Sequence, residues 1–148
     1  MRALLDVNVL VALLDSGHLH HRAATTWLMR NGGSGWASCP ITENGCVRVM
    51  SLQAYPNQQP AAAVAARLAA ATTRTSHAFW PDSVSLLDDG LIAWDRVLGH
   101  RQLTDVYLLA LAVANNGRLV TFDRAIPVAA VRGAQPKHLL ALPSLEGR

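Results

Sequence analysis

The sequence predicts an α/β fold in which helices cover a mainly parallel sheet. Short apolar runs alternate with longer helical segments along the chain, the pattern that parallel strands joined by helices produce. The 148 residues suit one compact domain, and a hydrophobic content of 51% is enough for a buried core. We expect a single domain over residues 1–142 and a loose C-terminal tail over residues 143–148.

The N-terminal half predicts two short strands and four helices. Residues 2–6 are an apolar run that ends in an acid. Asn8 is expected to cap a helix that stops at Gly17, and Pro40 suits the first turn of a later helix. The expected elements are strands at 2–6 and 36–38, and helices at 8–15, 18–30, 40–52 and 61–73. His18, His20 and His21, at the start of the expected helix 18–30, are interpreted as part of a solvated helix face.

The C-terminal half predicts two helices and three short strands. Thr104 is expected to cap a helix whose remainder is apolar on every side and therefore buried. Asn116-Gly117 closes that helix, and the next strand ends at Asp123. The expected elements are strands at 79–80, 119–122 and 139–142, helices at 88–98 and 104–114, and a polar connection at 99–103.

The composition excludes several classes of protein. Two cysteines, Cys39 and Cys46, are too few for a disulfide framework, and no cysteine–histidine spacing is typical of zinc sites. The longest apolar run, residues 107–114, is too short to span a bilayer, and acids interrupt any signal-peptide core. We therefore expect a cytoplasmic protein that does not enter a membrane.

The charge is compatible with a nucleic-acid ligand and does not establish one. The formal net charge is +3, the isoelectric point is about 9.4, and arginine supplies all but one of the basic residues. Arginine suits phosphate contacts, although a GC-rich genome also favours it. Only 16% of the residues are Asp, Glu, Lys or Arg, which hints at a surface covered by a partner.

Four acids occupy positions that a site at the edge of a sheet would use. Asp6 and Asp123 each follow a predicted strand, where open parallel sheets bind ligands. Glu43 and Asp105 each lie in the first turn of a predicted helix. Taken singly, each acid has an ordinary explanation as a turn residue or as a partner of the helix dipole. Together they would repel one another unless a cation compensates, and oxygen ligands suit Mg²⁺ or Mn²⁺.

The segments around these acids resemble PIN domains, especially the VapC toxins of bacterial toxin–antitoxin pairs. The resemblance covers residues 2–142. The matching segments are Leu4-Leu5-Asp6-Val7-Asn8-Val9-Leu10, Thr42-Glu43 with Val47-Arg48-Val49, Leu103-Thr104-Asp105-Val106-Tyr107, and Asn116-Gly117-Arg118-Leu119-Val120-Thr121-Phe122-Asp123. His77-Ala78-Phe79-Trp80-Pro81 is similar to a segment of mycobacterial members.

The resemblance implies a PIN-like three-layer sandwich that cleaves RNA with Mg²⁺, or Mn²⁺ as a substitute. It makes Asp6, Asp105 and Asp123 metal ligands and Glu43 the residue that orients or deprotonates the attacking water. Supporting hydrogen bonds are expected from Asn8, Thr104 and Thr121. The implied partners are an RNA substrate and a small VapB-like antitoxin, in a homodimer or a hetero-oligomer with that antitoxin.

Two alternatives remain open on the sequence. One is a PIN-type nuclease of RNA processing or DNA repair that has no antitoxin. The other is a non-enzymatic α/β domain with an acidic Mg²⁺ pocket, although Asp6 stands alone at its strand end where such domains usually carry adjacent acids. A short upstream gene for an antitoxin would separate the toxin from the first alternative.

Overall fold

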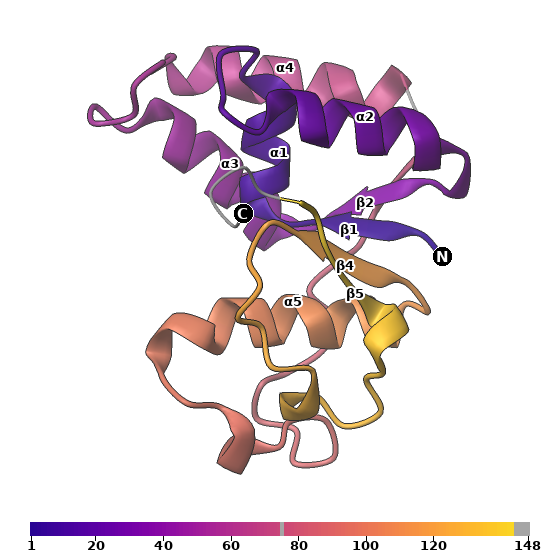
Figure 1. Ribbon diagram of the computed structural model, residues 1–148. Helices are drawn as coiled ribbons and strands as arrows, with labels where there is room; N and C mark the ends of the chain where they lie inside the picture. The colour runs from indigo at the N-terminus through magenta and orange to yellow at the C-terminus, as the bar shows by residue number, and fades with distance from the viewer. Residues whose placement is uncertain (75, 144–148) are drawn as a thin grey trace.

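A computed structural model describes residues 1–74 and 76–143 of the chain. Its elements follow the alternating order that the sequence predicts (Figure 1). The strands are β1 (Ala3–Leu5), β2 (Trp36–Ser38), β3 (His77–Phe79), β4 (Arg118–Thr121) and β5 (Leu139–Ala141). The helices are α1 (Val7–Leu14), α2 (His21–Asn31), α3 (Pro40–Ser51), α4 (Ala61–Arg74) and α5 (Leu103–Ala114).

Within the described residues the strands form one five-stranded sheet in the order β3-β2-β1-β4-β5. Every neighbouring pair is parallel, and Leu4 of β1 pairs with Ala37 on one side and with Leu119 on the other. The chain builds outward from β1 through β2 to β3 and then returns to β4. The sheet therefore has its topological switch point between β1 and β4, where such sheets bind ligands beyond the carboxyl ends of the strands.

The sheet lies between two layers of helices, so the predicted three-layer α/β sandwich is confirmed. Figure 1 shows α1 to α4 on one face and α5 on the other. Side chains alternate accordingly: Leu4 and Leu119 pack in the core beneath α5, whereas Ala3 and Leu5 pack in the core beneath α1 to α4. The middle of α5, from Val106 to Ala112, is wholly buried, as its apolar sequence predicts.

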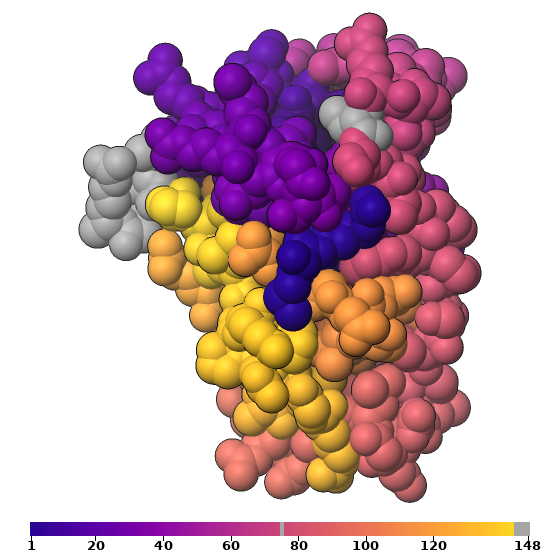
Figure 2. All heavy atoms as spheres, turned by 90° about the vertical axis from the view of Figure 1, so that its right-hand side faces the viewer, coloured from indigo at the N-terminus to yellow at the C-terminus, as the bar shows by residue number. Residues whose placement is uncertain are grey.

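The amino ends of the strands, where β1 begins, lie opposite the carboxyl ends that form the switch-point crevice. Figure 2 views the molecule from that side and shows the N-terminal residues at the surface, between α2 above and the C-terminal segment below. The residues that follow the strands therefore gather at the opposite edge. No helix of the described residues is long and apolar enough to cross a membrane.

The helix predicted over residues 88–98 is wrong. Apart from a short 3₁₀ turn at Trp94–Arg96, this segment is irregular. Its backbone bonds to a distant segment instead, because Ala93 N–H donates to Ala130 C=O and Arg132 N–H donates to Leu91 C=O. Hydrogen bonds to residues 130–132 have thus replaced the hydrogen bonds of a local helix.

Two helix starts also differ from the prediction. Asp6, rather than Asn8, caps α1, which ends at Leu14. The second helix begins at His21 instead of residue 18, because a turn over Asp15 to Gly17 and the residues after it come first. Of the expected C-terminal tail, residues 144–148 lie outside the described part of the chain.

Candidate active site

Asp6 is the central acid of the site. It follows β1 and caps α1, with Oδ1 accepting a 2.7 Å hydrogen bond from the N–H of Val7. Its Oδ2 accepts a 2.7 Å hydrogen bond from the hydroxyl of Thr121, and the residue is buried, with 6% of its surface exposed. Burial raises the pKa of Asp6 above its ordinary value, while these two hydrogen bonds oppose that rise.

Thr121 and Asn8 hold the ends of β1 and β4 together. The fully buried hydroxyl of Thr121 also accepts a 3.0 Å hydrogen bond from the N–H of Asp123. The amide of Asn8 donates to Thr121 Oγ1 at 3.3 Å and accepts from the N–H of Phe122 at 3.2 Å. Both residues therefore lie where supporting donors were expected, whereas Thr104 is exposed on the first turn of α5.

Three of the four predicted acids share one pocket of about 330 Å³, which we name the acid pocket. Asp105 reaches it from the first turn of α5, and Asp123 from the loop after β4. Its lining comprises Asp6, Val7, Asn8, Val11, His18, Val49, Tyr55, Asp105 and Asp123. Val7 also meets Gly45 of α3, where an added Cβ would lie 2.5 Å from Val7 Cγ2, so α1 and α3 approach closely beside the pocket.

Asp105 is the acid whose protonation this arrangement changes most clearly. Burial raises its pKa to about 7, and the negative charges of Asp6 and Asp123 and a hydrogen bond shared with Asp123 act in the same direction. One of these carboxyls therefore tends to retain a proton near neutral pH. A bound cation would reverse that tendency, because it stabilises the ionised form of each carboxylate.

The donor set fits a hard divalent cation in its chemistry. The three acids supply only carboxylate oxygens, the ligands that Mg²⁺ and Mn²⁺ prefer. In the described part of the chain, no group of three or more His, Cys, Asp or Glu side chains is arranged so that it could hold a metal ion as it stands. Each oxygen of Asp6 accepts one hydrogen bond, from Val7 or Thr121, and keeps a further lone pair that a cation could bind.

Glu43 does not line the acid pocket, so the structure brings three of the four predicted acids together there and leaves the role of Glu43 a prediction. Its Oε2 accepts a 2.6 Å hydrogen bond from the hydroxyl of Ser38, whose oxygen also lies 2.8 Å from Nε2 of His77. Glu43 lines a separate hollow between α3 and α4, together with Arg48. The carboxylate of Glu43, in the first turn of α3, therefore lies against Ser38 of β2.

Comparison with known proteins identifies the family. The family model of the PIN domain matches residues 3–131, most of the chain. The chain belongs to the PIN-domain family.

The similar proteins place this chain among the VapC-type members of the PIN-domain family. It is 51% identical over 142 residues to Ribonuclease VapC44 of Mycobacterium tuberculosis, covering 96% of this chain and 100% of the relative. It is 46% identical over 134 residues to Ribonuclease VapC39 of the same organism, covering 90% and 96%.

Two solved structures share the fold at low sequence identity. One is M. tuberculosis VapC20, described as a sarcin–ricin loop cleaving toxin, with a TM-score of 0.56, 14% identity and coverage of 90% of this chain and 99% of that one. The other is VapBC2 from Rickettsia felis bound to a DNA fragment from its promoter, with a TM-score of 0.54, 16% identity and coverage of 83% and 89%. Their likeness supports the fold of this PIN domain.

His18 is a lining residue of this PIN domain's acid pocket that the sequence reading missed. We expected it on a solvated helix face, but it lies in the turn before α2. The signal was Asp15-Ser16-Gly17, because an Asp followed two residues later by Gly is typical of a turn in which the carboxylate accepts from the backbone. Here Gly17 N–H donates to Asp15 Oδ1 at 3.0 Å.

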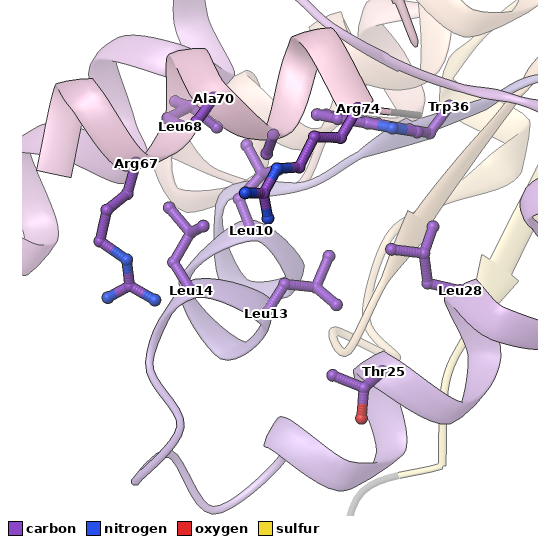
Figure 3. Close-up of a pocket in the computed structure, with 11 residues that line it drawn as sticks. Leu10, Leu13, Leu14, Thr25, Leu28, Trp36, Arg67, Leu68, Ala70 and Arg74 are labelled. Carbon is purple, nitrogen blue, oxygen red and sulfur yellow. The ribbon is translucent and has the colours of Figure 1, made fainter. Parts of the chain in front are cut away.

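The PIN domain also carries an apolar groove between α1, α2 and α4, with a volume of about 500 Å³ (Figure 3). We name it the leucine groove. Its apolar lining includes Leu10, Leu13, Leu14, Leu28 and Leu68. In Figure 3, Arg67 and Arg74 extend from α4 over this groove, so its rim is basic while its floor is apolar.

Proposed function

We propose that this chain is a metal-dependent endoribonuclease and the toxin of a VapBC-type toxin–antitoxin pair. The observation that carries the proposal is the acid pocket, in which Asp6, Asp105 and Asp123 meet at the switch point of the sheet. The full-length similarity to proteins named Ribonuclease VapC supports RNA as the substrate class. The proposal treats residues 1–142 as one catalytic domain.

Mg²⁺ is the proposed cofactor, with Mn²⁺ as a substitute, and Asp6, Asp105 and Asp123 are its proposed ligands. When bound, such an ion supplies an activated water and stabilises the charge that develops on the scissile phosphate. The protein's own part is to orient these acids: Thr121 and the start of α1 fix Asp6, and Thr121 also binds the backbone of Asp123. The pKa of Asp105 is about 7 beside two other acids, so this carboxyl is only partly ionised near neutral pH. A bound cation would stabilise its ionised form, and the ionised form would in turn bind the cation.

Glu43 is proposed to assist the reaction without binding the metal. It follows β2, which neighbours β1, so it lies at the same edge of the sheet as Asp6. Its hydrogen bond from Ser38 holds the carboxylate in place. An acid held in that way, outside the metal set, suits orientation of water or RNA more than coordination.

The leucine groove is the proposed binding surface for the antitoxin. An amphipathic helix buries its apolar face in such a groove, and Arg67 and Arg74 at the rim favour acidic residues on that helix. A basic side chain from the same partner, most simply arginine, would pair with Asp6 or Asp105 and block the site. The inactive state would then be a hetero-oligomer of toxin and antitoxin, with a homodimer of this chain as the alternative assembly.

Expression in bacteria tests this proposal. The wild-type chain should arrest growth, and co-expression with a small antitoxin encoded just upstream should restore it. Asp105→Asn, purified as a soluble protein of the same secondary structure, should be harmless. Harmless expression of soluble wild-type protein would contradict the toxin assignment. RNA cleavage by that same protein would then favour a PIN nuclease of RNA processing, and loss of both activities would favour a non-enzymatic domain.

A further inference from the structure

The acid pocket lacks an obvious partner for the RNA phosphate that the proposed function brings to it. The scissile phosphate is anionic, and three of the nine lining residues are acids. A bound cation offsets part of this repulsion, but the phosphate oxygens also need hydrogen-bond donors from the protein. His18 lies in the wall of the same pocket and carries two ring nitrogens.

The structure fixes which nitrogen of His18 can donate. The backbone N–H of His20 donates a 3.0 Å hydrogen bond to Nδ1 of His18, so Nδ1 is an acceptor and a neutral ring carries its proton on Nε2. Burial lowers the pKa of His18, which also favours the neutral ring near neutral pH. The ring therefore offers an N–H at Nε2.

The turn that holds His18 is tightly connected to the rest of the pocket. The N–H of His18 donates to the carbonyl of Asp15 at 3.0 Å. The Asp15 carboxylate in turn accepts hydrogen bonds from Gly17 N–H, Asn57 Nδ2 and the Tyr55 hydroxyl. Because Tyr55 itself lines the acid pocket, His18 is anchored to a second wall of that pocket.

The two other polar, uncharged side chains that line the acid pocket, Tyr55 and Asn8, are held in hydrogen bonds to neighbouring groups. The hydroxyl of Tyr55 donates to Asp15. The amide of Asn8 contacts Thr121 and the backbone of Phe122. Among the described lining residues, His18 is therefore a side chain outside these hydrogen bonds that offers an N–H to an anionic ligand.

We propose that His18 is a substrate-contacting residue whose Nε2–H donates a hydrogen bond to a non-bridging phosphate oxygen of RNA in the acid pocket. The proposal rests on the proposed ribonuclease function and deepens it by naming a residue outside the acidic set. His18 binds RNA in this role and is not a metal ligand.

Purified variants test this role with a labelled RNA oligonucleotide that spans a site mapped with the wild-type protein. His18→Ala should lower kcat/KM about 10- to 100-fold, the usual effect of losing a hydrogen bond to a charged group. His18→Gln keeps an N–H donor near the position of Nε2 and should recover most of this loss. Leu19→Ala, in the same turn but exposed, should stay within about twofold of wild type.

RNA binding gives a second readout that does not depend on cleavage. In the Asp105→Asn background, fluorescence anisotropy with a fixed single-stranded RNA should show about tenfold weaker binding when His18→Ala is added. The Mg²⁺-induced rise in Tm of the otherwise wild-type protein should be unchanged by His18→Ala. A reduced rise would instead mean that His18 acts through the metal, which overturns the proposed RNA contact.

The two proposals fail in different ways. If the wild-type protein cleaves RNA and His18→Ala cleaves and binds it equally well, the role of His18 is wrong and the ribonuclease function stands. If His18→Gln is as impaired as His18→Ala at an unchanged Tm, the hydrogen-bond role is also wrong. If the wild-type protein cleaves no RNA with Mg²⁺ or Mn²⁺, the ribonuclease function is wrong. In that case the binding assay still tests His18, because unchanged RNA binding by His18→Ala would overturn the proposed contact.

Discussion

The hydroxyl of Thr121 donates a 2.7 Å hydrogen bond to Oδ2 of Asp6, although the two residues lie 115 positions apart in the chain. This bond joins the carboxyl ends of β1 and β4, the two strands that flank the switch point of the sheet. The same hydroxyl accepts from the N–H of Asp123. One buried oxygen therefore links two of the three acids in the pocket.

Thr121→Val should destabilise the protein by about 1–3 kcal/mol, because it leaves Oδ2 of the buried Asp6 without its donor while keeping the shape of the side chain. Urea unfolding at pH 7 in EDTA measures the change. Thr121→Ser keeps the hydroxyl and should cost clearly less. Equal losses in the two variants would mean that the methyl group, and not the hydrogen bond, stabilises this junction.

The raised pKa of Asp105 predicts a pH-dependent stability with a definite sign. Its pKa is about 7 in the folded protein and about 4 in the unfolded chain, so the folded state holds the proton more tightly. Without metal, this group makes the protein lose stability as the pH rises from about 4 to about 7.

Asp105→Asn removes that loss. In EDTA the variant should be more stable than wild type at pH 8 by about 1–2 kcal/mol, a value reduced for solvent screening because Asp105 is only half-buried. The advantage should disappear near pH 4, where wild-type Asp105 is protonated. Thermal melts at the two pH values measure it, and a variant less stable than wild type at pH 8 would show that Asp105 has a structural role.

The fold and three acids were predictable because their signals are local. Asp6 and Asp123 directly follow apolar strands, and Asp105 begins an apolar helix, so a parallel sheet brings all three to one edge. The directions of side chains were not predictable in the same way. Glu43 has the same local setting as Asp105, but Ser38 and His77, from two other strands, determine where its carboxylate points.

Two other errors have the same physical origin. Residues 88–98 carry a helical pattern, but hydrogen bonds to residues 130–132 replace the helix, and no local signal announces that pairing. His18 lies outside α2 because a turn at Asp15 precedes that helix. That turn is stabilised by Tyr55 and Asn57, about 40 residues further along the chain.

A Mg²⁺-binding assay should distinguish the role of Glu43 from that of the three aspartates. Mg²⁺ at millimolar concentration should raise the Tm of the wild-type protein, because a ligand that binds only the folded state stabilises it. The rise should be lost in Asp105→Asn and Asp123→Asn and retained in Glu43→Gln, although all three variants cleave RNA poorly. A rise lost in Glu43→Gln as well would place Glu43 among the metal ligands.

Charge reversal on α4 tests the leucine groove. The double substitution Arg67→Glu and Arg74→Glu should weaken binding of the antitoxin at least about tenfold, because it sets like charges against the acidic partner helix. Arg30→Glu on α2, exposed and outside the groove, is the matched control. Isothermal titration calorimetry with purified antitoxin measures both, and equal affinities for the double variant and the control would move the docking surface elsewhere.

Cleavage of RNA by the purified protein tests the central claim most directly. Wild-type protein, stripped of metal and incubated with total bacterial RNA, should give discrete cleavage products when Mg²⁺ or Mn²⁺ is added and none in EDTA. Asp105→Asn and Asp123→Asn, folded to the same Tm or higher, should lower the cleavage rate at least about 100-fold. Cleavage that persists in EDTA, or that either variant carries out at the wild-type rate, would contradict the account.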